Sequence, residues 1–435
     1  MAGLTIITGR AGSGKTTRIM RQIADAVAHS APGQLLLIPE QYSHEAEKEL
    51  CRVCGDRLSL YGEVLSFTRL AALVEEELSC RRVLLDKGGR LLAMKVALRA
   101  LEGRLKVYGT AQRRPENLTA LIDLLSELKS AEISAAALEA AAEKEGGALG
   151  EKLRDFALIL AAYDAVTSQG SADPADRLTL LAQDLPRSTV GTRGHIYIDG
   201  FTDFTAQEIS VIAALMDKNA PVTVCLTCDS LSDGSEVFDA PRKTALHLIA
   251  MAKERGLSVQ VEQMQPKPGQ DASALSFLEQ HLFTYTPEHC DDDSDAVRLF
   301  TAPDEMAECA LAAATCLELV RTRACRWRDI AVAVRGFSGY ARMLESVFAY
   351  YGVPLYIGRR SAVTEKPLPL MLAGAFEVLS GGWDGKAVLA WLKTGLCGAE
   401  TTELDELENY ALQWDLRGGI WTRPEPWTLS VAGFN

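Results

Sequence analysis

Short apolar runs alternate with amphipathic helical patterns at the start of the chain and again near its middle. The runs at residues 4–9, 33–39 and 62–67 are typical of buried strands, and helical patterns separate them. Two further apolar runs, at 195–201 and 221–227, flank another helical pattern. Strands that alternate with helices predict a parallel sheet covered by helices on both faces.

Between about residues 70 and 185 the strand pattern disappears and amphipathic helices take its place, as in LTALIDLLSELKS. We therefore predict one α/β domain from residues 1–75 and 186–265, interrupted by a helical insertion at 76–185. A second alternation begins near residue 296, where VRLFTAP, DIAVAVR and PLYIG are expected strands. It predicts the start of a second α/β unit over 296–362, followed by helices over 363–435. The stretches PKPGQDASA and EHCDDDSDA are expected to be exposed connectors.

Composition describes an ordinary globular chain of 435 residues, 48% hydrophobic and 24% charged. No apolar run is long enough to span a membrane, and the N-terminus lacks the features of a signal peptide. These features predict a cytoplasmic protein. Because the second α/β unit has few strands, we also expect the chain to be part of a longer protein.

Ten cysteines are scattered along the chain, a density too low for a disulfide framework. Two pairs have C-x-x-C spacing, Cys51 with Cys54 and Cys225 with Cys228. Two such pairs could make a zinc site. We favour ordinary reduced thiols over a zinc site, because in a strand that spacing points the side chains of Cys225 and Cys228 to opposite faces.

The segment GRAGSGKT, residues 9–16, fits the phosphate-loop pattern G-x-x-x-x-G-K-[ST] between a strand and a helix. Its glycines allow the backbone to wrap an anion, and the following helix directs its N-terminal dipole at the phosphates. The predicted nucleotide-binding residues are Gly9, Arg10, Ala11, Gly12, Ser13, Gly14, Lys15, Thr16 and Thr17. Lys15 is expected to reach the β- and γ-phosphates, and the Thr16 hydroxyl to ligate Mg²⁺. The alternative is a glycine-rich turn that matches by chance.

The run HIYIDGF supplies the second carboxylate that a phosphate loop needs. Asp199 follows a buried strand and is expected to hold Mg²⁺ through water. Its alternative role is to start a turn. Gly200 follows, so no side chain there can activate the attacking water, and we predict no catalytic residue and little ATP hydrolysis.

One window departs from the formal net charge of −13. Residues 81–114 hold ten Lys or Arg, among them Arg90, Lys95 and Arg99, against only Asp86 and Glu102. Such a cluster on helices is typical of contacts with nucleic-acid phosphates, although a solvated helix face is the simpler interpretation. We favour DNA contact.

The order of these motifs resembles a superfamily 1 helicase. A phosphate loop at the N-terminus, a helical insertion and an Asp strand followed by a glutamine share that family's plan. The resemblance implies that Gln207 senses the γ-phosphate and that Arg335, in DIAVAVRG, touches the nucleotide from the second lobe. It also implies that Ser66 and Phe67 grip single-stranded DNA. For Phe67, a place in the hydrophobic core is an equally good interpretation.

Several phrases, in order, resemble one branch more closely: GRAGSGKT, IPEQYSHEAE, VLSFTRLA, DGFTDFTAQE and WLKTGL…ELENYAL. Together they are similar to the AddB family, one of the two components of the bacterial AddAB helicase–nuclease. The resemblance implies two RecA-like domains, each with a helical insertion. It also implies binding of ATP and DNA, pairing with an AddA subunit, repair of double-strand breaks by recombination and help in recognising Chi. Family members are longer and end in a nuclease domain with an iron–sulfur cluster, whose cysteines are not expected among these ten.

The chain also departs from a working helicase. Gly200 replaces the catalytic acid, TCDSLSDGS does not match the usual third motif, and no glutamine segment for adenine precedes Leu4. These departures favour a protein that binds nucleotide without turning it over. Two alternatives stay open: an autonomous phosphate-loop enzyme such as a small-molecule kinase, and an inert scaffold with a relic loop.

Overall fold

The computed structural model describes residues 3–109, 115–168, 170–218, 220–232, 234–265, 274–284, 288–291, 296–323, 325–358 and 363–428. The chain forms two compact units, residues 1–298 and 299–435. Among the described residues, none of the helices combines the length and the apolar character needed to cross a membrane.

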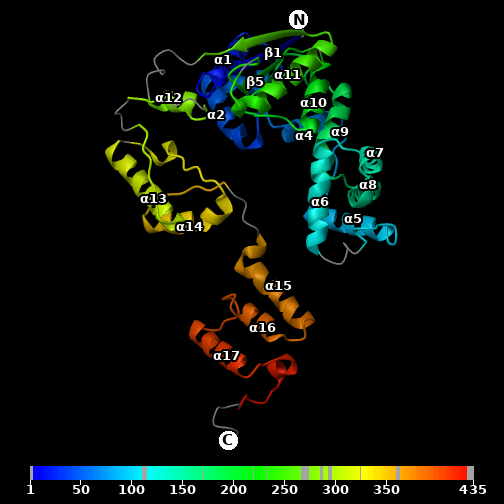
Figure 1. Ribbon diagram of the computed structural model, residues 1–435, viewed down its shortest axis with the longest axis vertical. Coiled ribbons are helices and arrows are strands. Elements are labelled where there is room, and N and C mark those ends of the chain that lie inside the picture. Colours follow the sequence, from blue (N-terminus) through cyan, green and yellow to red (C-terminus); the bar gives the residue numbers. More distant parts are fainter. Residues whose placement is uncertain are drawn as a thin grey trace. The chain divides into compact units, whose positions relative to one another are not determined.

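A parallel sheet of six strands lies at the centre of the first unit (Figure 1). The strand order is β3-β2-β4-β5-β1-β6, and all neighbours run parallel. The strands are β1 (Gly3–Gly9), β2 (Gln34–Leu37), β3 (Gly62–Leu65), β4 (His195–Ile198), β5 (Val222–Thr227) and β6 (Ser258–Gln263). The five strands predicted for this unit are confirmed. One strand, β5, separates β1 from β4.

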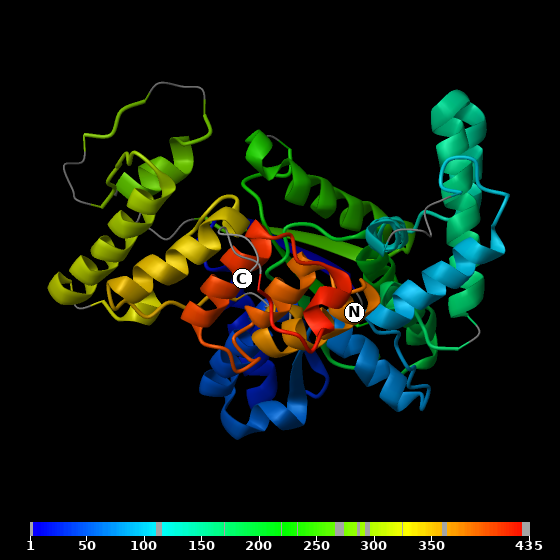
Figure 2. The same cartoon turned by 90° about the horizontal axis from the view of Figure 1, so that it is seen from below.

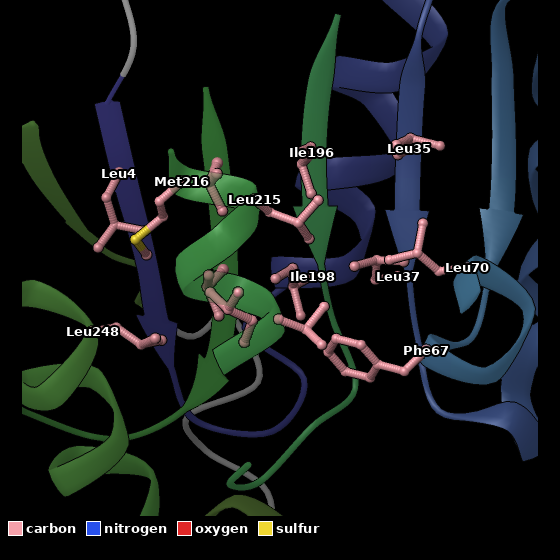
Figure 3. Close-up of a cluster of buried hydrophobic side chains, with 14 of the residues drawn as sticks. Leu4, Leu35, Leu37, Phe67, Leu70, Ile196, Ile198, Leu215, Met216 and Leu248 are labelled. Atoms are coloured by element: carbon pink, nitrogen blue, oxygen red, sulfur yellow. The ribbon is translucent and has the colours of Figure 1, made fainter. Parts of the chain in front are cut away.

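Both faces of the sheet are buried, which explains why its strands are continuous apolar runs. Leu35 and Leu37 of β2 point to one face, whereas Leu36 points to the other. The larger core includes Ile196 and Ile198 of β4 packed near Leu215 (Figure 3). Its helices are α4 (Phe67–Glu77), α9 (Arg177–Asp184), α10 (Ala206–Met216) and α11 (Asp239–Glu254). Helices α1 (Lys15–Ala28), α2 (Ser43–Cys54) and α3 (Leu58–Tyr61) pack on the opposite face. The α/β class with a RecA-like sheet is confirmed.

The helical insertion has a hydrophobic core of its own. Helices α5 (Lys87–Ala100), α6 (Pro115–Ser130), α7 (Ala135–Glu145) and α8 (Gly147–Thr167) surround buried side chains such as Met94, Leu125 and Tyr163. These helices stand at one side of the sheet in Figures 1 and 2. Leu181 of α9, which follows them, belongs instead to the core of the sheet.

A buried cluster of charged groups joins the insertion to the sheet domain. The Lys129 ammonium lies 2.8 Å from the Asp164 carboxylate, 2.7 Å from Asp176 and 3.4 Å from Asp173. Asp173 is fully buried and also pairs with Arg90 at 3.0 Å. Because Asp173 and Asp176 precede α9, these ion pairs connect helices α5, α6 and α8 to the segment that re-enters the sheet domain.

The second unit differs from the sequence prediction, because no strand forms in its described residues. It contains helices α13 (Glu305–Thr322), α14 (Phe337–Tyr350), α15 (Pro367–Ser380), α16 (Gly385–Leu392) and α17 (Thr401–Gln413). The expected strands at 297–303, 329–335 and 354–358 have no ladder partners. Ile330, Val334 and Leu355 nevertheless pack against α13 and α14, so the apolar patterns mark burial there and not strand pairing.

The described cysteines are all free thiols. Cys51 and Cys54 lie in α2, whereas Cys225 and Cys228 lie in and just after β5. Among the described residues, no group of three or more His, Cys, Asp or Glu side chains has the arrangement of a metal site. The two C-x-x-C pairs therefore do not come together as a four-cysteine zinc site.

His195 gives the fold a predicted dependence on pH. Its ring stacks on Tyr197 with centroids 4.2 Å apart, and its Nε2 lies 2.8 Å from the Thr223 hydroxyl. Burial lowers the pKa of His195 from 6.5 to about 4. As pH falls, the unfolded chain therefore binds a proton at His195 before the folded chain does. The stabilising contribution of the neutral His195 ring is complete above pH 6.5 and is lost as pH falls towards 4.

We expect that loss to be about 2 kcal/mol, after allowance for partial solvent screening of the ring. Urea unfolding of the wild type and of His195→Gln between pH 4 and pH 7.5 measures it. The variant should show a flatter dependence over this range. Parallel curves for the two proteins would contradict the assignment.

Candidate nucleotide site

The phosphate loop, residues 9–16, joins β1 to α1 at the carboxyl end of the sheet. Gly12 and Gly14 have φ angles of +75° and +90°, values that favour glycine. A side chain at Gly9 would meet the Ser13 hydroxyl at 2.5 Å and the Met264 carbonyl at 2.8 Å. The loop therefore needs glycine at these three positions for its turn and for its close approach to neighbouring backbone.

Lys15 points into the loop that contains it. Its Nζ donates to the carbonyl oxygens of Gly9 at 2.7 Å and Arg10 at 2.9 Å, and its side chain is buried. Burial lowers the pKa of Lys15, while the nearby Cys225 and Asp199 act in the opposite direction. An ammonium has three donors, so one N–H stays available for a phosphate oxygen. Thr16 and Thr17 are exposed in the first turn of α1.

Asp199 follows β4 at the same edge of the sheet. Its backbone N–H donates to the Leu37 carbonyl at 3.0 Å, and its side chain is buried at 8% exposure. The Asp199 charge acts to raise the pKa of Lys15 across this edge of the sheet, where β5 lies between β4 and β1. Asp199 also acts on Cys225. Burial is the larger cause that raises the pKa of the Cys225 thiol, and the Asp199 charge raises it further. A lysine after β1 and a carboxylate after β4, at the same edge of one parallel sheet, are the groups that a magnesium–phosphate complex requires.

The backbone conformation at position 200 requires glycine. Its φ is +81°, and a Cβ there would lie 3.2 Å from Cδ of Pro39. The turn after Asp199 therefore demands glycine for its backbone conformation, and an acid cannot simply be restored by substitution.

We expect Gly200→Glu to lower the free energy of unfolding by about 1–2 kcal/mol, because an L-residue is strained at this φ. It should bring no gain in ATP hydrolysis. Chemical unfolding and a phosphate-release assay measure the two effects. Gly170→Ala is the matched control, because no atom lies near a Cβ there and its φ is not positive. An unchanged unfolding midpoint in Gly200→Glu would contradict the strain argument.

The structure places Gln207 and Arg335, the two residues for which the helicase resemblance implies contacts with the nucleotide, in different parts of the chain. The buried Gln207 amide donates at 2.8 Å to both the Ala175 carbonyl and the Thr179 hydroxyl. Its donor is thus committed to the segment that leaves the helical insertion, and this geometry does not support γ-phosphate sensing. Arg335 belongs to the second unit, directly before α14, and its contact with nucleotide stays a prediction.

Ser66 and Phe67 serve the fold. Ser66 is buried at 3% exposure, caps α4 by accepting from the Arg69 N–H, and donates to Glu40 at 2.9 Å. Phe67 is 5% exposed and packs edge to face against Phe201, with ring centroids 5.5 Å apart. This burial supports the core interpretation of Phe67, and the alternative, stacking on DNA bases, stays a prediction.

The basic window divides into paired and exposed cations. Arg90 is half-buried, and its guanidinium contacts the Asp173 carboxylate and the Ser126 hydroxyl. These partners make it a weaker candidate for DNA contact than the exposed cations, and that contact stays a prediction. Arg82 and Lys106 are also paired, with Asp184 and Glu151. Within the described part of the chain, Arg81, Lys87, Lys95, Arg99 and Arg104 are exposed and form no ion pair. Arg113 and Arg114 lie outside the described residues.

Sequence patterns missed the surroundings of Arg10. Its guanidinium forms an ion pair with Glu279 at 3.0 Å and lies over the Phe238 ring, 5.5 Å from the centroid. Glu279 belongs to α12 (Ala274–His281), a helix between two connectors. The PKPGQDASA connector falls almost wholly outside the described residues. A short run such as LSFLEQH carries too little periodicity to predict α12.

A parallel α/β sheet with a glycine-rich loop after β1 and an acidic residue after β4 places the chain in the class of RecA-like α/β proteins. The family model described as "ADDB, N-terminal" matches residues 6–279. The chain therefore belongs to the AddB family and covers its N-terminal region. This membership favours the helicase-subunit interpretation over an autonomous small-molecule kinase.

Curated relatives agree with this assignment along almost the whole chain. A protein of Acetivibrio thermocellus, named as the B subunit of an ATP-dependent helicase/deoxyribonuclease, is 31% identical over 98% of this chain. Proteins of the same name from Thermoanaerobacter sp. and Heliobacterium modesticaldum are 32% and 33% identical, again over 98% of the chain. The chain spans only 38%, 38% and 36% of the length of these three relatives.

Proposed function

We propose that this chain is the nucleotide- and DNA-binding N-terminal part of a subunit that processes DNA double-strand breaks for recombinational repair. In this proposal it binds ATP with Mg²⁺ through residues 9–17 and Asp199, and hydrolyses it little. The relatives are named as helicase/deoxyribonuclease subunits, which supports the DNA-processing role. We assign the nuclease activity, with the iron–sulfur cluster of the family resemblance, to the parts of those longer proteins outside the match.

One observation carries the nucleotide proposal: Lys15 after β1 and Asp199 after β4 lie at the same edge of the parallel sheet, whereas the turn beyond Asp199 requires glycine. The first two groups suit a magnesium–phosphate complex, and the third position offers no base for water. Equilibrium binding of Mg·ATP to the purified chain, measured beside its rate of turnover, tests the proposal.

The relatives are named as one subunit of an enzyme, which supports assembly with a second protein, and the family resemblance identifies that protein as AddA. An intact loop beside a site without a catalytic base fits a non-motor subunit, with the partner as the motor. Recognition of Chi belongs to the same proposal at the level of the whole subunit.

We propose that DNA contacts the exposed face of α5. Lys95 and Arg99 are exposed there, and they alternate with Leu92 and Val96, which are 67% and 54% exposed. These four residues recur at helical spacing, so they share one face. Cations would bind phosphates and the apolar neighbours would pack on sugars or bases, which positions DNA without reading its sequence.

We expect the double variant Lys95→Glu/Arg99→Glu to bind single-stranded or forked DNA at least about tenfold more weakly and with a shallower salt dependence. Fluorescence anisotropy at several salt concentrations measures both. The control is Lys243→Glu/Lys253→Glu, which makes the same charge change at two exposed positions of α11. Equal weakening in both double variants would show a general charge effect and remove α5 from the DNA path.

A further inference from the structure

A cavity of about 290 Å³ opens beside the phosphate loop. Arg10 of the loop forms one part of its wall. Further parts come from the short helical turn Glu236–Phe238 after β5 and from residues 275–284 in and after α12. The cavity is near the lower end of the range that small-molecule sites occupy, about 300–1,000 Å³. It suits a compact ligand and not a folded partner.

Hydrogen bonds and an ion pair hold Arg10 on one side of the cavity and the segment of Phe238 on the other. Arg10 pairs with the Glu279 carboxylate at 3.0 Å and also donates to the Glu279 carbonyl at 3.2 Å. The segment that carries Phe238 is held by Asp229, which accepts from the Ser235 N–H at 2.9 Å. Arg242 adds hydrogen bonds at 3.0 Å to the carbonyls of Ser230 and Ser235. The Arg10 guanidinium and the Phe238 ring are therefore held at defined places.

Beside the polar residues Ser235, Gln280 and Thr284, the lining includes apolar side chains that are exposed to an unusual degree. Side chains of this kind that line the cavity and are 37–64% exposed are Val237, Leu275, Leu278, Leu282 and Phe283. Soluble proteins seldom leave such groups together in solvent unless they bind something. An apolar slot with a planar aromatic ring, a guanidinium and one carboxylate is typical of a site for a flat heteroaromatic ring.

We propose that this cavity receives the purine base of the nucleotide whose phosphates the loop binds. The inference rests on the proposed nucleotide function, and Arg10 supports it because that residue belongs both to the phosphate loop and to the cavity wall. The base lies against Phe238 and the leucines of α12. The Glu279 carboxylate, which only accepts hydrogen bonds, takes one from an amino group on the base.

Base recognition then comes from residues that follow β5 and β6, far along the chain from the phosphate loop. Arg10 neutralises Glu279 in the cavity, so the carboxylate does not repel the neighbouring phosphates.

The experiment compares Mg·ATP with magnesium tripolyphosphate, which has the phosphates but no base. Calorimetry on the wild type is expected to show at least about tenfold tighter binding of ATP, the size of a base-stacking contribution. Phe238→Leu and Leu278→Asn should each reduce ATP affinity toward that of tripolyphosphate and leave tripolyphosphate binding unchanged. The control is Leu246→Asn, a partly exposed leucine of α11 that does not line the cavity.

The outcomes separate the two proposals. Equal affinity for ATP and tripolyphosphate, or variants that bind ATP like the wild type, would overturn the base site and leave the phosphate site standing. Binding of neither ligand would overturn both. Loss of ATP affinity in Leu246→Asn to the same extent as in Leu278→Asn would also overturn the base site, because the effect would not depend on the cavity.

Discussion

Replacing Lys15 by alanine is expected to weaken Mg·ATP binding at least about 100-fold, which is close to abolishing it. The Lys15 ammonium is buried in the phosphate loop beside Asp199, where it is held by two carbonyl oxygens at 2.7 and 2.9 Å. A charge-assisted hydrogen bond to phosphate is strong in such a place, and alanine cannot replace it. Isothermal titration calorimetry with Mg·ATP measures the loss.

The substitution should leave the fold intact. Burial disfavours the charged Lys15 side chain, as its lowered pKa indicates, so its removal takes away a cost as well as two hydrogen bonds. Thermal unfolding checks this point. Lys243→Ala, an exposed lysine on α11, is the matched control and should bind Mg·ATP normally. Wild-type affinity in Lys15→Ala would contradict the phosphate-binding role.

Replacing Lys129 by methionine is expected to lower the free energy of unfolding by about 3–5 kcal/mol. Lys129 faces three carboxylates, of which Asp173 is fully buried and Asp176 is part of the turn before α9. Burial acts to lower the pKa of Lys129, but hydrogen bonds to Asp164 and Asp176 outweigh it and raise the pKa. Without the ammonium, the Asp173 carboxylate keeps only Arg90 as a neutralising partner among the described residues.

Urea unfolding of Lys129→Met beside Lys144→Met measures this effect. Lys144 is an exposed lysine of α7 in the same insertion, so its loss should change stability little. Asp173→Asn combined with Lys129→Met should recover part of the stability, because the uncompensated charge is then removed. A loss below about 1 kcal/mol in Lys129→Met would show that the cluster is not stabilising.

The same cluster connects the insertion to the site. Asp173 and Asp176 belong to the segment that receives both hydrogen bonds of Gln207, at Ala175 and Thr179. Gln207 lies at the start of α10, which follows the turn of Asp199. The residue that the helicase resemblance assigns to phosphate sensing thus links the insertion to that turn.

The sheet could be predicted because each of its central strands is buried on both faces. Runs such as LTIITG and QLLLIP carry that burial in their composition alone. β6 has the sequence SVQVEQ and lies half exposed at an edge, so its pattern gave no comparable signal. In the second unit the apolar runs are similar, but a strand also needs a neighbour's backbone, which sequence composition does not specify.

The candidate site also contains residues whose positions local sequence predicts and residues whose contacts it does not predict. The positions of residues 9–16 and Asp199 at strand ends were predictable because local spacing produces the turns there. Arg90 and Phe67 were not, because their roles depend on Asp173 and Phe201, which are distant in sequence. Glycine at position 200 suggested a lost base, and only the backbone angle shows that the turn itself requires glycine.

The most direct test of the account is to incubate the purified chain with Mg·ATP and to measure bound and hydrolysed nucleotide in the same sample. We predict stoichiometric binding that depends on Mg²⁺, with the nucleotide recovered as intact ATP. Failure to bind nucleotide would indicate an inert scaffold with a relic loop. Repeated turnover to ADP would contradict the assignment of Gly200 as a position without a base.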